Sequence, residues 1–142
     1  MEKYLLALDL GKGSLGMAIS RSGFLVTPLK NLRFHMMKFD EAIAGIKEVM
    51  LTEKVSKFVI GYPSYPSGDP TEMSYIVLDF IKLLEKEFPD IPVVKQDERY
   101  STVEASGILH ENGQNAKKQH KNIDSAAATV ILERYLRSIH QL

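Results

Sequence analysis

A short apolar run that contains a single acid places the strongest constraint on how this chain can fold. Residues 4–10 are apolar except for Asp9, and Gly11 follows directly. An unbroken run of this length, closed by a glycine turn, is typical of a buried strand. Because a buried carboxylate is costly unless a charged group meets it, Asp9 either caps the turn or belongs to a charged site.

The pattern after this strand predicts an antiparallel meander followed by helices and strands in alternation. Further strands are expected at 15–20 and 24–34, and Pro28 favours an edge or a bulge in the second of these. The expected elements that follow are a helix from Asp40, which is a plausible cap, a strand at 57–62, a helix at 71–88, a strand at 91–96, a helix at 101–112 and a final helix at 123–138. This order predicts an α/β fold with a mixed five-stranded sheet, an antiparallel meander plus parallel strands, flanked by helices.

Length and composition limit the classes of protein to which this chain can belong. A chain of 142 residues suits one domain, 1–142, and 18 basic against 18 acidic residues exclude a protein held to nucleic acid by bulk charge. The absence of cysteine excludes disulfides, thiolate zinc sites and cysteine nucleophiles. No apolar run approaches a membrane span and the N-terminus does not resemble a signal peptide, so we expect a cytoplasmic protein without a membrane partner.

Two further acidic positions accompany Asp9. Asp97 and Glu98 end the last expected strand, and Asp124 lies in the first turn of the last expected helix. The simpler interpretations are a solvated charge cluster around Arg99 and an acid that complements the helix dipole. However, Asp124 shares a helical face with Ala127 and Ala128, which are small enough to let the helix approach the sheet closely, so Asp124 would point towards the strand ends.

If these acidic side chains lie close together, their chemistry indicates what they would bind. Clustered carboxylates repel one another and need a cation or a proton. Hard oxygen ligands suit Mg²⁺ or Mn²⁺. Two such ions about 3.5–4 Å apart can clamp a phosphodiester, one activating water and the other stabilising the leaving oxygen. Three scattered acids become a site only if the fold brings them together.

Several blocks of the chain together resemble one known family. They cover nearly the whole chain in the right order, and the most specific is the Asp-Glu-Arg block after a strand. The matching blocks are Leu6-Ala7-Leu8-Asp9-Leu10-Gly11, Gly16-Met17-Ala18-Ile19-Ser20, Val59-Ile60-Gly61-Tyr62-Pro63, Asp97-Glu98-Arg99-Tyr100-Ser101-Thr102-Val103-Glu104-Ala105 and Asp124-Ser125-Ala126-Ala127-Ala128 with Ile131-Leu132 and Tyr135-Leu136. The chain resembles the YqgF/RuvX family of RNase H-like nucleases, described as pre-16S rRNA processing nucleases or Holliday junction resolvases.

The resemblance implies a metal-dependent nuclease whose catalytic and metal-binding acids are Asp9, Glu98 and Asp124, with Mg²⁺ or Mn²⁺ as cofactor. Asp97 is kept in reserve, because alternation along a strand sends Asp97 and Glu98 to opposite faces. Arg99 would orient a carboxylate or contact phosphate. The implied partner is nucleic acid, either structured RNA such as the 5′ end of pre-16S rRNA or branched DNA, and the protein could be a monomer or a homodimer.

Three segments depart from the family pattern near the expected substrate. The first is Gly11-Lys12-Gly13-Ser14, the second is 64–68, and the third is the basic stretch 114–121, expected to be a mobile loop. We expect Lys12, Lys117, Lys118 and Lys121 to contact phosphates, although a charge run is more often an ordinary solvated segment. Tyr62 and Tyr65 could stack on bases or simply pack.

Two other classes of protein remain possible. Asp9-Leu10-Gly11 with Ser14 resembles the phosphate-binding hairpin of actin-like ATP-binding proteins, but those need two domains and a second hairpin, which 142 residues do not offer. A non-catalytic RNA- or ribosome-binding module of the same fold is the other alternative. Retention of all three acids argues against such a module.

Overall fold

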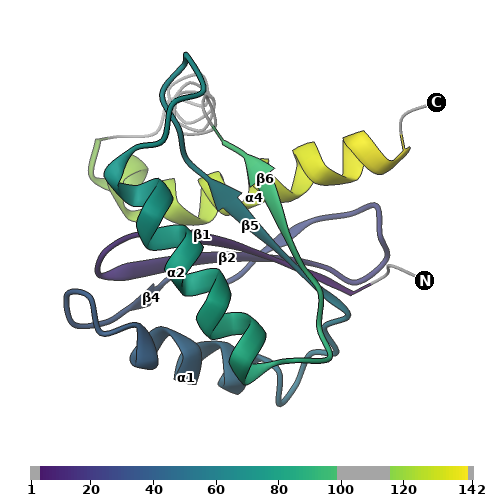
Figure 1. Ribbon diagram of the computed structural model, residues 1–142. Helices are drawn as coiled ribbons and strands as arrows, with labels where there is room; N and C mark the ends of the chain where they lie inside the picture. The colour runs from purple at the N-terminus through teal and green to yellow at the C-terminus, as the bar shows by residue number, and fades with distance from the viewer. Residues whose placement is uncertain (1–3, 99–115, 141–142) are drawn as a thin grey trace.

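The structure is a computed structural model that describes residues 4–98 and 116–140, and within the second segment the side chains from 126 onward. Figure 1 shows a central sheet with helices on both sides. The elements in chain order are β1 (Leu5–Leu10), β2 (Ser14–Ser20), β3 (Thr27–Pro28), β4 (Leu32–Arg33), α1 (Phe39–Val49), β5 (Lys57–Tyr62), α2 (Glu72–Glu87), β6 (Val93–Asp97) and α4 (Ala116–His140).

The sheet is mixed, as the sequence predicts. Its strand order is β3-β2-β1-β5-β6, with β4 also paired to β2. β1 and β2 are antiparallel, whereas β5 is parallel to β1 and β6 is parallel to β5. The two parallel connections run through α1 and α2, which are the helical crossovers that a parallel pair requires.

The third expected strand, 24–34, is divided into two short strands, so the sheet has six strands and not five. Pro28 of β3 pairs with Ala18 of β2, and Leu32 of β4 pairs with Leu15 of β2. Pro28 itself remains paired, and the ladder along β2 breaks after it, where one extra residue on this strand shifts the pairing, as in a β-bulge. The chain still follows the edge of β2, because the N–H of Leu29 donates to the carbonyl of Met17 at 2.9 Å.

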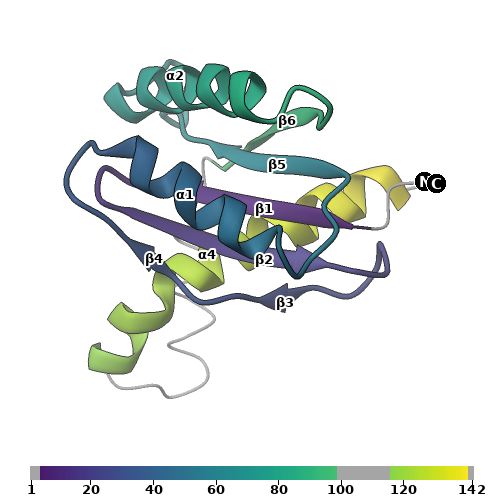
Figure 2. The ribbon, with the colours of Figure 1, turned by 90° about the horizontal axis from the view of Figure 1, so that it is seen from below.

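The first face of the sheet carries the larger apolar core. It combines even-numbered residues of β1 with α1 and α2, and its members include Leu6, Leu8, Leu10, Ile43, Ile46, Phe58, Ile60, Val77, Phe80 and Leu84. Figure 2 shows α1 in front of β1 and β2, with α4 behind them. Apolar side chains that recur every three or four residues in α1 and α2 explain why these helices lie against this face.

Among the described residues, the second face is covered by α4. Its core combines odd-numbered residues of β1 with one stripe of the helix, and its members are Leu5, Ala7, Ala18, Val59, Ala128, Ile131, Leu132, Tyr135 and Leu136. Ala128 is fully buried. Its small side chain lets the helix axis lie close to the strands, as the sequence predicts.

The helix boundaries differ from the expected ones at two places. The N-cap of α1 is Lys38, not Asp40, and no side chain caps it; Asp40 lies in the first turn instead. The expected polar loop 114–121 is helical from Ala116 onward, so α4 does not begin at Asn122. The segment 116–140 contains neither glycine nor proline, so nothing in it stops a helix. The helix expected at 101–112 lies outside the described residues.

The start of α2 follows the expected boundary and shows why it lies there. Thr71 caps the helix through a reciprocal pair of hydrogen bonds with Ser74, in which each side chain accepts from the other's backbone N–H. The hydroxyl of Ser74 also donates to the carbonyl of Pro63, which closes the base of the 63–70 loop. None of the helices in the described ranges is long and apolar enough to cross a membrane.

Candidate active site

Asp9 lies near the carboxyl end of β1, on the face covered by α4. The odd-numbered neighbours Leu5 and Ala7 belong to the α4 core, whereas Leu6, Leu8 and Leu10 belong to the opposite core. Asp9 is half-buried, although the strand residues on either side of it are buried. The alternation along β1 therefore brings a carboxylate to the end of an otherwise apolar surface.

Glu98 reaches the same face from the other side of β5. An atom built at the Cβ position of Gly61 would lie 2.3 Å from Glu98 Oε2 and 2.6 Å from Ile131 Cδ1 of α4. The Glu98 carboxylate therefore lies over the backbone of Gly61, beside the helix. Leu8 of β1 pairs with Ile60 of β5. Continuing this register by one residue sets Asp9 beside Gly61, on strands about 4.8 Å apart.

Asp97 belongs to the opposite face. Val94 packs into the α4 core and Val93 into the larger core. The alternation then assigns position 97 to the side of α2, away from Asp9. Because Glu98 lies over Gly61 and Asp97 does not share that face, Glu98 is the acid of the pair that the fold brings towards Asp9.

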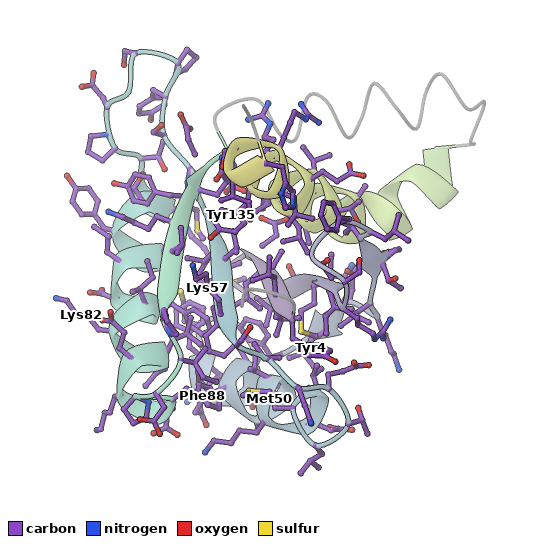
Figure 3. The ribbon with its side chains drawn as sticks, turned by 90° about the vertical axis from the view of Figure 1, so that its right-hand side faces the viewer. Tyr4, Met50, Lys57, Lys82, Phe88 and Tyr135 are labelled. Atoms are coloured by element: carbon purple, nitrogen blue, oxygen red, sulfur yellow. The ribbon has the colours of Figure 1, made fainter. Side chains whose placement is uncertain are left out.

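The direction of α4 determines where position 124 lies. Near the start of β5, the amino group of Lys57 donates to the hydroxyl of Tyr135 at 3.0 Å, and Figure 3 shows the two residues coming together from β5 and α4. Near the end of β5, Ile131 contacts Gly61. The helix therefore runs antiparallel to β5, and its earlier residues lie beyond the carboxyl ends of the strands.

Position 124 precedes Ile131 by two helical turns, about 10 Å along the axis, and so falls on the same stripe of α4 as the residues that face the sheet. Figures 1 and 2 both show α4 beginning at the end of the molecule that carries the turn between β1 and β2. The backbone thus brings position 124 to the end of the sheet where Asp9 and Glu98 lie. The side chain of Asp124 is outside the described residues.

The basic positions expected at the substrate are distributed over two elements. Lys12 lies in the β1–β2 turn and forms an ion pair with Glu72 in the first turn of α2. Both side chains are substantially exposed, so this pair contributes little to stability and leaves Lys12 accessible. Three other expected contacts, Lys117, Lys118 and Lys121, belong to the first turns of α4, and Arg99 lies outside the described residues.

The 63–70 loop stands beside this end of the sheet and is internally bonded. Ser64 bridges to Pro70, and the N–H of Tyr65 donates to the carbonyl of Asp69 at 2.9 Å. Tyr65 is exposed, whereas Tyr62 packs against the larger core with the amino group of Lys95 5.1 Å from its ring centre. Tyr65 is therefore the more exposed of the two tyrosines that could stack on bases, and Tyr62 is half-buried.

A groove of about 600 Å³ lies elsewhere, between β4, α1 and the α1–β5 connection. Met17, Leu32 and Val49 line it together with Glu48 and Glu53. It opens on the side of the larger core and includes none of the three expected acids, so it is not part of the acidic site.

The acidic site provides part of the ligand set that a hard divalent cation requires. The Glu98 carboxylate fills the space left by the missing side chain of Gly61, and alternation assigns Asp9 of the neighbouring strand to the same face. Oxygen ligands of this type fit Mg²⁺ or Mn²⁺. No group of three or more potential metal ligands is present among the described residues, and the third expected ligand, Asp124, is not among those whose side chains are described.

Comparison with known proteins decides the family. Residues 3–138 match the RuvX family, which is described as "Holliday junction resolvase". The chain belongs to the RuvX family. This assignment covers nearly the whole sequence and agrees with the resemblance seen in its motifs.

Individual relatives are similar to this chain along most of their length. A protein of Onion yellows phytoplasma (strain OY-M), named "Putative pre-16S rRNA nuclease", is 37% identical over 131 residues, which cover 92% of this chain and 87% of the relative. A protein of the same name from Mesomycoplasma hyopneumoniae (strain 7448) is 38% identical over 141 residues, covering 97% and 98%.

Solved structures of RuvC share the fold. Thermus thermophilus RuvC in complex with a Holliday junction substrate superposes with a TM-score of 0.57 at 13% identity, covering 98% of this chain and 96% of that one. A second Thermus thermophilus RuvC structure gives a TM-score of 0.54 at 12% identity, covering 96% and 95%. The fold class predicted from the sequence, an RNase H-like α/β fold, is therefore confirmed.

Proposed function

We propose that this RuvX protein is a divalent-metal-dependent endonuclease for structured nucleic acid, with the 5′ end of pre-16S rRNA as its substrate. The observation that carries the proposal is the position of the Glu98 carboxylate over Gly61, on the face of the sheet to which alternation along the neighbouring strand assigns Asp9. Relatives that are 36–38% identical over most of the chain carry the name of a pre-16S rRNA nuclease, which favours RNA as the substrate.

Each acid has a distinct part in the proposed mechanism. Asp9, on the central strand, would hold a divalent cation together with Glu98, which follows β6, and Asp124 of α4. When bound, such cations would supply positive charge for activating water and stabilising the leaving oxygen. Among the described residues, α4 covers the apolar half of this face, so water and substrate would approach the acids from the carboxyl ends of the strands.

The phosphate backbone of the substrate would approach across the β1–β2 turn and the start of α4. Lys12 on the turn, Lys117, Lys118 and Lys121 on the first turns of α4, and Arg99 after β6 are the proposed phosphate contacts. Lys12 would exchange its exposed partner Glu72 for a phosphate, which is a small change because the ion pair is solvated. Neutralising phosphates in this way makes binding weaken steeply with salt.

The test compares two substrates under matched conditions. A labelled pre-16S rRNA 5′ fragment and a synthetic four-way DNA junction are incubated with wild type and with Asp9→Asn, in Mn²⁺ and in EDTA. We expect metal-dependent cleavage of the RNA, and we expect Asp9→Asn to cleave at less than about one hundredth of the wild-type rate while remaining folded. Circular dichroism of both proteins provides the folding control.

The results separate the candidate functions. Cleavage by Asp9→Asn at the wild-type rate would contradict the assignment of the acidic site. Preferential cutting of the junction would favour a resolvase, the second candidate, which the description of the matching family supports. Metal-independent binding without cleavage of either substrate would favour a binding module.

A further inference from the structure

Gly61 occupies a position in β5 where no other residue would fit without displacing a neighbour. A Cβ at this position would lie 2.3 Å from Glu98 Oε2, 2.7 Å from Glu98 Cδ and 2.6 Å from Ile131 Cδ1. Distances below 3.0 Å between such atoms essentially do not occur in proteins. Even alanine would therefore force both the Glu98 carboxylate and the Ile131 methyl to move.

The other residues of β5 on this face show that the strand does not otherwise need a glycine. Val59 is fully buried against α4, and Lys57 reaches Tyr135 on the same face. Glycine inside a strand weakens it and often marks a close approach of another group. Here the group that approaches is a carboxylate, and it lies over the strand next to the one that carries Asp9.

We propose that Gly61 is a positioning residue for the metal site: its missing side chain forms the slot that holds the Glu98 carboxylate over β5, facing Asp9. This inference rests on the proposed function, since it assigns Gly61 a part in holding the acid that would bind the cation. A wider side chain would push the carboxylate off the sheet and away from Asp9. Gly61 itself touches neither the cation nor the substrate.

The first experiment measures metal binding without substrate. Mn²⁺ is titrated by calorimetry into wild type, Gly61→Ala and Glu98→Gln, each checked for its thermal unfolding midpoint. We expect Gly61→Ala to stay folded and to bind Mn²⁺ about 10- to 100-fold more weakly, the range for groups that orient metal ligands. In cleavage assays we expect kcat to fall and KM for the nucleic acid to change little.

Two double variants distinguish positioning of the carboxylate from packing of the helix. Aspartate is one methylene shorter than glutamate, so in a Glu98→Asp background the added Gly61→Ala should weaken Mn²⁺ binding less than threefold further. Ile131→Val removes the methyl nearest the slot. Gly61→Ala/Ile131→Val should therefore recover thermal stability and still bind Mn²⁺ weakly, and it supplies the readout if Gly61→Ala alone does not fold.

The possible outcomes have different meanings. Wild-type Mn²⁺ affinity in Gly61→Ala, or full recovery of affinity in Gly61→Ala/Ile131→Val, would overturn the positioning role and leave Gly61 as a packing residue. Wild-type affinity and cleavage in Glu98→Gln would instead contradict the proposed metal site itself. Weak Mn²⁺ binding in Glu98→Gln together with normal binding in Gly61→Ala would reject only the inference about Gly61.

Discussion

The two faces of the sheet differ in how far their apolar cover extends. The face under α1 and α2 is apolar along β1 to Leu10 and along β5 to Ile60. The face under α4 is apolar at Leu5, Ala7 and Val59, and then continues with Asp9, Gly61 and the overlying Glu98. Both faces are formed by the same strands. Side-chain alternation therefore gives one face apolar core residues along its length and gives the other face acidic residues at the strand ends.

Neighbouring residues of one strand can therefore have unrelated roles. Leu8 is fully buried in the larger core, and Asp9 is the next residue. Substitutions at the two positions should therefore separate stability from activity. We expect the effect of substitution on stability to decrease from Leu8→Ala through Ala128→Leu to Glu53→Gln.

Leu8→Ala should destabilise the protein by about 2–5 kcal/mol, because it removes buried methyl groups and leaves a cavity beneath α1 and α2. Cleavage per folded molecule should stay near the wild-type value. Urea unfolding gives the first quantity, and cleavage rates at a temperature where the variant is folded give the second. Asp9→Asn is the matched control, with the reverse behaviour expected. If Leu8→Ala lost cleavage while fully folded, the two faces would not be independent.

Ala128→Leu should cost about 1–3 kcal/mol by overpacking the contact between α4 and the sheet, where Ala128 is fully buried. Unlike Leu8→Ala, it should also reduce cleavage, because lifting α4 moves position 124 and Ile131 relative to β5. Glu133→Leu, on the exposed side of the same helix, should change neither quantity appreciably. Thermal unfolding and cleavage rates of the two variants test this, and unchanged cleavage in folded Ala128→Leu would argue against a role for the position of α4.

Glu53→Gln should have the smallest effect, and one that depends on pH. Its carboxylate accepts two hydrogen bonds from Arg21, at 2.9 and 2.7 Å, which lower the pKa of Glu53 below its ordinary value. A native pKa below the unfolded one stabilises the fold above the unfolded pKa, and that contribution is lost as the pH falls through the native value.

The unfolding midpoint of Glu53→Gln should therefore lie below that of wild type at neutral pH, and the difference should shrink as the pH falls below about 4. Lys47→Gln, which removes a different surface ion pair with Glu87, is the control for loss of one charge. A difference that stayed constant from neutral to acidic pH would show that the carboxylate charge of Glu53 is not what stabilises the fold.

Local patterns predicted most of the fold, and the exceptions have physical causes. The apolar runs of β1 and β5 lie where periodicity indicates, and α2 begins and ends within one residue of the expected helix at 71–88. The strand expected at 24–34 is divided after Pro28, where its pairing with β2 shifts by one residue, in line with the edge or bulge that the proline favours. The early start of α4 was missed because the polarity of 116–121 suggests a loop, although these residues tolerate a helix.

The site was less predictable than the fold. Alternation indicated that Asp97 and Glu98 face opposite sides, but only the packing of Val93 and Val94 shows which side each takes. The sequence assigns Gly61 no role beyond its place in a block that resembles the family, although a glycine inside an apolar strand often marks the close approach of another group. The ligand roles of Asp9, Glu98 and Asp124 stay predictions, because no local pattern defines how three distant segments meet.

The order of the strands has a consequence for when the protein can become active during its synthesis. β1 pairs with β2 through a short turn, so the hairpin that carries Asp9 can form within microseconds of leaving the ribosome. Glu98 reaches its slot only after β6 joins β5, and α4 comes last in the chain. A nascent chain thus carries the first acid long before the others, and the complete acidic set can assemble only once nearly all of the protein has been made.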